Sequence, residues 1–256
     1  MKNSSRKFLT GWDSGEIARH SRAADLLTSI TRHVWEYVRS HPKITEYEIE
    51  QFVREEFRKN NLASPKPFDT QIVAFNEHAA SIHYFPPSEN SAKLAPNTLI
   101  LLDIWARLRK SRSPFADITW VAFHGRKIPS EIQKVFDIVI GARDACVKYL
   151  ENNLEKKKIP TGAEIDLVAR QAIWSAGYGE YFYHGGHCIG FASPHGKGVN
   201  ISPKFPQRLQ KNVGYTIEPG IYLPGKFGIR SEINFYIDSR CKLIITTSLQ
   251  RHIIKT

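Results

Sequence analysis

The feature that most constrains the fold is an internal repeat, in which similar elements recur in the same order. Thr45 with Glu48, and Thr161 with Glu164, form two S/T-x-x-E patterns 116 positions apart. This pattern is a capping box, which satisfies backbone donors where a helix begins. A long helical pattern precedes each capping box, and strand-like segments follow it. We therefore expect two related halves.

The strand patterns come after the helical ones in both halves. The segments that read as strands are 68–77, 80–85 and 97–108 in the first half, and 214–223 and 228–238 in the second. Each half is therefore predicted to end in a pair of strands.

Each predicted strand pair carries two acids at the same spacing. Asp103 and Asp117 lie 14 positions apart, as do Glu218 and Glu232, and the two pairs are offset by 115. Asp103 and Glu218 both lie in runs of buried-type residues, so we expect them at strand positions. Buried carboxylates brought together repel one another unless cations neutralise them. A pair of bound metal ions would neutralise this repulsion.

The residues alone leave other interpretations open. Each acid could instead pair with a basic residue such as Arg107 or Arg230. The stretch HGGHCIGFASPHG, residues 184–196, holds three histidines, but structural histidines are commoner than metal ligands. His20, His33, His78 and His124 are expected to be surface or structural histidines. Cys188 is expected to pack as a small residue.

Charge and cysteine content limit the class of protein. The chain has 36 Lys and Arg against 25 Asp and Glu, a net charge of +11, which could attract an anionic partner. Its basic runs lack the interleaved aromatics of a nucleic-acid stacking surface, so no specific nucleic-acid partner is expected. Three unpatterned cysteines and the lack of a long apolar run predict no disulfide framework, no leader and no membrane span. We expect a cytoplasmic protein.

Four stretches resemble, in order and separation, the signatures of one known family. They are ADIT (116–119), GYGEYFYHGGHCIG (177–190), YTIEPGIYLPG (215–225) and GIRSE (228–232). The family is that of the pita-bread metallohydrolases, which includes aminopeptidase P, prolidase, methionine aminopeptidase and creatinase. The similarity runs from about residue 14 to about residue 240. It is greatest to the catalytic domain of Xaa-Pro aminopeptidases.

The resemblance implies an α+β pita-bread fold. Its two pseudo-symmetric halves, at about 14–125 and 126–240, would share a curved, mostly antiparallel sheet covered by helices. We expect a flexible tail at residues 1–13 and a single catalytic domain at 14–256, with no further N-terminal domain before it. A monomer or a homodimer would be compatible with this organisation.

The resemblance also implies five metal ligands: Asp103, Asp117, His187, Glu218 and Glu232. Four carboxylates would offset the charge of two divalent ions, and one imidazole favours a transition metal such as Mn, Co, Fe or Zn. In the family's mechanism a metal-bridging hydroxide attacks a carbonyl, and the acid at the position of Glu218 carries protons.

Further roles follow from the same resemblance. His83 and His195 would hold the substrate carbonyl or the oxyanion by hydrogen bonds. His184 would lie on the substrate side of the cleft. Arg230 would steady Asp117 and Glu232, the carboxylates that bridge the two ions in the family, from outside the metal-binding groups.

The chain departs from the family pattern at several places. Trp105 stands where Gly is usual, and Trp120 stands where Arg is common. The segment between Asp103 and Asp117 is longer than is usual in the family, and so is the span from His187 to His195. In contrast, His184 is one position closer to His187 than the corresponding histidine usually is. These departures, the two tryptophans included, are expected to cluster around the cleft and to shift the substrate preference.

The leading functional hypothesis is a dinuclear metalloaminopeptidase of the Xaa-Pro type, acting on a peptide. One alternative keeps the fold but uses a non-peptide, small-molecule substrate, by C–N hydrolysis or by iron-dependent oxidative chemistry. The other alternative is a metal-free peptide-binding module. The presence of all five expected ligands argues against a metal-free module.

Overall fold

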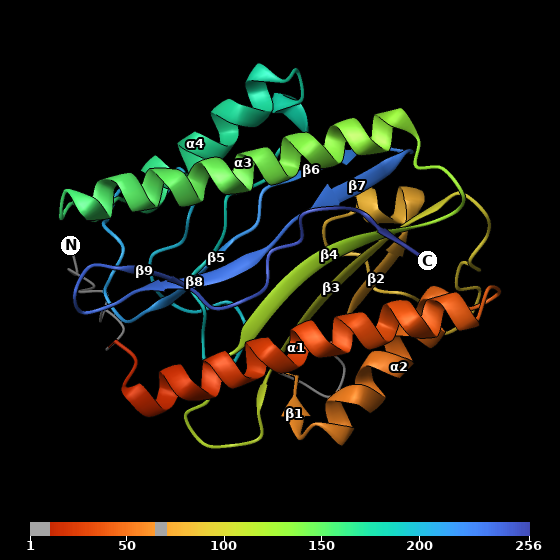
Figure 1. Cartoon of the computed structure of the whole chain (residues 1–256), viewed down its shortest axis with the longest axis horizontal. Helices are drawn as coiled ribbons and strands as arrows, with labels where there is room; N and C mark the ends of the chain where they lie inside the picture. The colour runs from red at the N-terminus through yellow and green to blue at the C-terminus, as the bar shows by residue number, and fades with distance from the viewer. Residues whose placement is uncertain (1–10, 65–70) are drawn as a thin grey trace, which may run out of the picture.

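The computed structural model describes residues 11–64 and 71–256. Two long helices, α1 (Ser14–Ser40) and α3 (Ser130–Glu155), flank the strands that lie between them (Figure 1). Each is followed by a shorter helix, α2 (Glu46–Lys59) or α4 (Gly162–Ser175). Thr45 and Thr161 cap these shorter helices, and both bonds of each capping box are present. The predicted repeat of helices is confirmed.

The strands form one larger sheet, built from four first-half strands and one from the C-terminal end, and two smaller sheets in the second half. The first contains β1 (Leu62–Ala63), β2 (Ile72–Phe75), β3 (Thr98–Leu108), β4 (Ala116–His124) and β10 (Ile254–Lys255). The others are β5 (Gly214–Ile217) with β8 (Ile233–Ile237) and β9 (Leu243–Ile245), and β6 (Gly220–Leu223) with β7 (Phe227–Arg230). All pairings between these strands are antiparallel except that of β10 with β4. The α+β class is confirmed.

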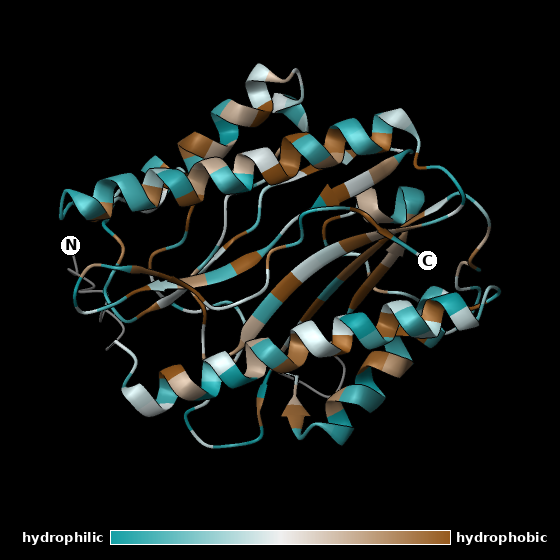
Figure 2. Cartoon of the chain, in the orientation of Figure 1, coloured by the Kyte–Doolittle hydropathy of each residue, from teal (hydrophilic) through white to brown (hydrophobic). Residues whose placement is uncertain are grey.

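Side chains alternate along β3 and β4 and so separate two cores. Leu102 and Ile104 belong to the core under α1 and α2, whereas Leu101 and Val121 belong to the core shared with the second half. Hydrophilic and hydrophobic residues alternate along α1 and α3, as in amphipathic helices that cover a sheet (Figure 2). Asp103 alternates with Leu102, so it lies on the face that meets the second half.

A buried acid in each shorter helix repeats as well. Glu50 in α2 accepts a hydrogen bond from Arg54 Nε at 2.6 Å, and Asp166 in α4 accepts one from Arg170 Nε at 3.1 Å. Each acid also accepts a backbone N–H from the segment that leads to the cleft. The repeat therefore extends to the polar groups that anchor each half.

One strand prediction was wrong and two others were wrong in part. Residues 80–85 form no strand, because η1 (Asn76–Ala80) is followed by local turns and the Tyr84 hydroxyl donates to Glu46 Oε2 at 2.7 Å. The segments 214–223 and 228–238 are each interrupted, at residues 218–219 and 231–232.

The predicted tail of residues 1–13 lies mostly outside the described residues. Its last two residues belong to the folded domain. Trp12 is buried with its ring 4.8 Å from that of His20, and the side chain of Asp13 accepts from Glu16 N at 2.7 Å to cap α1. Within the described residues, no helix is long and apolar enough to cross a membrane.

Candidate metal centre

Both halves contribute to one cavity of about 200 Å³. Its lining includes every site residue predicted from the sequence: His83, Asp103, Asp117, His184, His187, His195, Glu218, Arg230 and Glu232. These residues come from segments scattered over more than half of the chain. The fold therefore brings together the complete predicted set.

The two halves present their acids in different ways. Asp103 on β3 and Asp117 on β4 lie in the middle of strands, on the inner face of the sheet. Glu218 and Glu232 instead lie where the strands are interrupted, between β5 and β6 and between β7 and β8. Backbone bonds hold these interruptions, because Glu218 N donates to Gly185 O at 2.9 Å and Glu232 N to Thr119 O at 3.3 Å.

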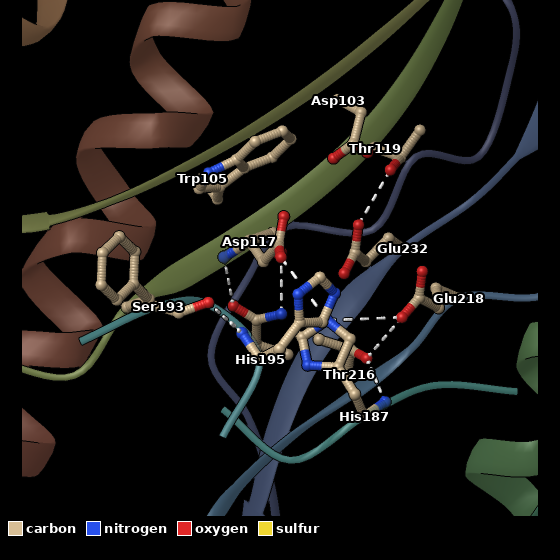
Figure 3. Close-up of polar contacts among 12 residues, drawn as sticks. Asp103, Trp105, Asp117, Thr119, His187, Ser193, His195, Thr216, Glu218 and Glu232 are labelled. Atoms are coloured by element: carbon tan, nitrogen blue, oxygen red, sulfur yellow. Dashed lines mark hydrogen bonds and ion pairs between the residues drawn. The ribbon is translucent and has the colours of Figure 1, made fainter. Parts of the chain in front are cut away.

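Three of the predicted ligands have the geometry of a metal site. Ligand atoms of Asp117, His187 and Glu232 all lie within 4.8 Å of one another, and the three residues are buried. His187 Nδ1 lies 3.0 Å from Cys188 O, which fixes the proton on Nδ1. The lone pair of Nε2 is then free, and Nε2 lies 3.6 Å from Asp117 Oδ2 (Figure 3). This orientation suits a metal-binding imidazole.

The carboxylates also fit cations because their hydrogen bonding is incomplete. Among the described residues, Asp103 Oδ1, Asp117 Oδ1 and Glu232 Oε1 are buried and have no hydrogen-bond partner. A buried carboxylate oxygen without a partner is costly. Divalent ions between these oxygens would remove that cost.

Electrostatics divide the acids into two kinds. Burial and repulsion from Asp103 raise the pKa of Asp117 well above its usual value, and burial and repulsion from Asp117 do the same for Glu232. Burial also raises the pKa of Asp103. Burial acts in the same direction on Glu218, but the charges of His184, His187 and Arg230 and the hydrogen bond from Thr216 together outweigh it and lower the pKa of Glu218. Glu218 is thus the one acid of this cluster whose pKa is lowered.

Arg230 contacts a different carboxylate from the ones predicted. Its Nη2 donates to Asp103 Oδ2, its Nη1 to the Tyr222 hydroxyl at 2.8 Å, and its Nε to Thr119 Oγ1 at 2.9 Å. The Thr119 hydroxyl in turn donates to Glu232 Oε2 at 2.8 Å. Arg230 therefore pairs directly with Asp103, as the ion-pair alternative expected, and reaches Glu232 only through Thr119.

The three remaining predicted histidines surround this cluster. The His195 ring lies 4.4 Å from the His187 ring. Although the His195 side chain is exposed at the cavity, its partial desolvation there and then repulsion from His187 lower its pKa to about 4. His184 Nδ1 lies 4.0 Å from Glu218 Oε1. His83 is exposed at the cavity lining. His195 is neutral at pH 7, so it can donate one hydrogen bond and accept another.

Sequence reasoning missed two threonines that orient the site. Besides Thr119, Thr216 donates to Glu218 Oε1 at 3.0 Å and accepts from His187 N at 2.8 Å (Figure 3). Thr119 lies two positions from Asp117 within β4, so these two side chains share a face, and Thr216 in β5 has the same spacing to Glu218, which directly follows that strand. That spacing was the signal that could have identified them.

Residues 18–239 match the profile described as "Metallopeptidase family M24". The chain belongs to this family.

Similar M24 proteins include both characterised and uncharacterised peptidases. An uncharacterized peptidase of Schizosaccharomyces pombe is 33% identical over 193 residues, covering 75% of this chain and 40% of that protein. The X-Pro aminopeptidase of Thermotoga maritima MSB8 superposes with a TM-score of 0.83 at 30% identity, covering 96% of this chain and 64% of that one. A dipeptidase of Pyrococcus horikoshii OT3 superposes with a TM-score of 0.82 at 26% identity, also covering 96% of this chain and 64% of that one. The chain thus spans less than two thirds of each of these relatives, and its pita-bread fold is confirmed.

Of the two tryptophans that depart from the M24 pattern, only one faces the cleft. Trp105 is two positions from Asp103 and lines the cavity. Trp120 follows Thr119 directly and therefore points to the opposite face, where it packs in the core under α1 and α2. The expectation that both act at the cleft is wrong for Trp120.

The two lengthened segments of this M24 protein pack against each other. Phe115, at the end of the longer hairpin, donates its backbone N–H to Gly190 O at 3.0 Å. Arg112, in the same hairpin, pairs with Glu16 of α1 and places its guanidinium 5.8 Å from the ring of Phe191. The loop that leads to the predicted substrate-binding histidine at 195 is therefore supported by the hairpin.

Replacing Arg112 with Ala is expected to lower the free energy of unfolding by about 1–3 kcal/mol, because the buried Glu16 carboxylate loses its partner. Urea denaturation of the purified protein measures this change. Lys110→Ala, in the same hairpin, is the matched control and should stay within about 0.5 kcal/mol of wild type. Equal stability of the two variants would show that the Arg112 contact is unimportant.

Proposed function

We propose that this protein is a dinuclear metal-dependent aminopeptidase of the Xaa-Pro type, which releases an N-terminal residue that precedes proline. The observation that carries this proposal is the convergence of four carboxylates and one metal-oriented imidazole on a single cavity. The similarity to the X-Pro aminopeptidase of Thermotoga maritima supports the choice of substrate.

The proposed ions would lie between the two halves. Asp117, His187 and Glu232 would hold one ion together with Glu218, whose Oε1 lies 3.5 Å from His187 Nε2, and Asp103 would serve the second ion with Asp117 and Glu232. Oxygen ligands with one imidazole suit Mn, Co, Fe or Zn. When bound, such a pair lowers the pKa of water and polarises a carbonyl.

The side chains around the ions would carry the proton and hold the substrate. Glu218 Oε1 accepts a hydrogen bond from the Thr216 hydroxyl, which keeps the carboxylate oriented. In this orientation Glu218 would take a proton from water and later pass it to the leaving amine. Neutral His195 would donate a hydrogen bond to the carbonyl oxygen, and His83 would do so from the cavity rim. His184 beside Glu218 would contact the substrate on the second-half side.

A metal-loaded substrate screen tests the proposal. The protein is stripped with a chelator, reloaded separately with each of the four metals, and assayed on short peptides that begin Xaa-Pro or Xaa-Ala. We expect up to two ions per chain and release of the first residue, both lost on chelation. A chain that retains no ion after reconstitution, or activity that survives chelation, would contradict the proposal.

A second candidate is C–N hydrolysis of a non-peptide substrate. Trp105 occupies the cleft beside the acids, and the cavity of about 200 Å³ is smaller than the roughly 300–1,000 Å³ of most ligand pockets. A loaded site that cleaves none of the peptides would favour this candidate.

A further inference from the structure

One side of the cleft is an apolar wall. It consists of Ile72, Ile82, Phe85 and Trp105, all from the first half of the chain. Ile72 lies directly across β2 and β3 from Asp103, and Trp105 lies across β3 and β4 from Asp117. The apolar wall is therefore immediately beside the carboxylates.

The opposite side of the cleft is polar. The second half supplies His184, His187, His195 and Glu218 to the lining. An N-terminal amine is cationic and is attracted to the acids, including those of the sheet. The side chain on the same α-carbon would then point toward the first-half side, against Ile72 and Trp105.

We propose that the apolar wall binds the side chain of the first residue of the substrate, and that Trp105 restricts this subsite to small apolar side chains. The proposal rests on the proposed aminopeptidase function. Trp105 is held in place because it lies within β3 and its backbone N–H donates to Gln71 Oε1 at 2.8 Å. Its side chain is only 9% exposed and packs in the core shared with the second half, and closely packed side chains resist displacement.

Substitution of Trp105 tests the restriction. The ratio of kcat/KM between peptides beginning with Leu and with Ala is measured for wild type, Trp105→Val and Trp105→Phe. Wild type should favour Ala at least about tenfold, and Trp105→Val should raise the Leu-to-Ala ratio at least about tenfold, with Trp105→Phe between them. Trp120→Phe, on the opposite face of the same sheet, is the matched control and should keep the wild-type ratio. An unchanged ratio in both Trp105 variants would overturn the proposal.

A binding measurement separates this proposal from the proposed function. Calorimetry with alaninamide and leucinamide needs no turnover and reports the same subsite. Wild type should bind alaninamide more tightly, and Trp105→Val should reverse the order. If wild type cleaves no peptide, the proposed function fails, but the reversal still supports the subsite. The same order of affinity in both proteins overturns the subsite even if peptides are cleaved.

Discussion

Replacing Asp117 with Asn is expected to abolish retention of metal and to slow peptide hydrolysis by at least about 100-fold, the upper end of the loss seen when a supporting partner of a metal ligand is removed. Asp117 lies in the three-residue cluster that best fits an ion, and one of its oxygens has no hydrogen-bond partner among the described residues. Metal analysis of the purified variant and initial rates on an Xaa-Pro peptide measure the two effects.

The same substitution should have the opposite effect on the metal-free protein. Burial and repulsion from Asp103 raise the pKa of Asp117 well above its usual value, so the ionised carboxylate destabilises the fold when no cation is bound. In the presence of chelator, Asp117→Asn should therefore have a higher Tm than wild type. With metal added, only wild type should gain stability.

Glu46→Gln is the control for these measurements, because Glu46 is a buried acid outside the cleft. It accepts hydrogen bonds from Phe75 N at 2.6 Å and from the Tyr84 hydroxyl at 2.7 Å. Its replacement should lower the Tm with or without metal and leave metal content unchanged. Full metal content in Asp117→Asn, or a Tm in chelator that falls as in Glu46→Gln, would contradict the assignment.

The fold was predictable to the extent that its signals are local. A capping box lies within four residues, so Thr45 and Thr161 could be identified without tertiary information. The error at residues 80–85 has a long-range cause, since Tyr84 is held by Glu46, 38 positions earlier in the chain. A strand-like composition could not show that this segment turns instead of pairing.

The site was predictable as a set of residues but not as a set of contacts. The family-like spacing selected nine residues that all line the cavity, whereas the pairing of Arg230 with Asp103 joins positions 127 apart. Trp120 lies on the face of the sheet away from the cleft. This position was implicit in its spacing of three from Asp117, because residues an odd number apart in a strand face opposite sides. The contact of Phe115 with Gly190 depends on how two loops meet, which no local pattern records.

His20 should make the fold sensitive to mild acid. Its ring is buried in α1, with Nδ1 2.7 Å from Phe115 O and Nε2 2.7 Å from Thr246 Oγ1. Burial, opposed by the Phe115 carbonyl, lowers the pKa of His20 from 6.5 to about 4. Between these pH values the unfolded chain takes up a proton that the folded chain does not, so stability is lost as the pH falls. The loss from this group is about 3 kcal/mol by pH 4.

Glutamine at position 20 should remove most of this dependence, because its amide can donate to Phe115 O and accept from Thr246 without titrating. The difference in free energy of unfolding between wild type and His20→Gln, measured by urea denaturation in chelator from pH 7 to pH 4, should shift by about 3 kcal/mol in favour of the variant. Acids elsewhere titrate in both proteins and cancel in this difference. Thr246→Val keeps the titrating ring but removes one of its hydrogen bonds, so it should be less stable than wild type at every pH and follow a parallel curve. A curve for His20→Gln that also runs parallel to wild type would show that His20 does not couple folding to protonation.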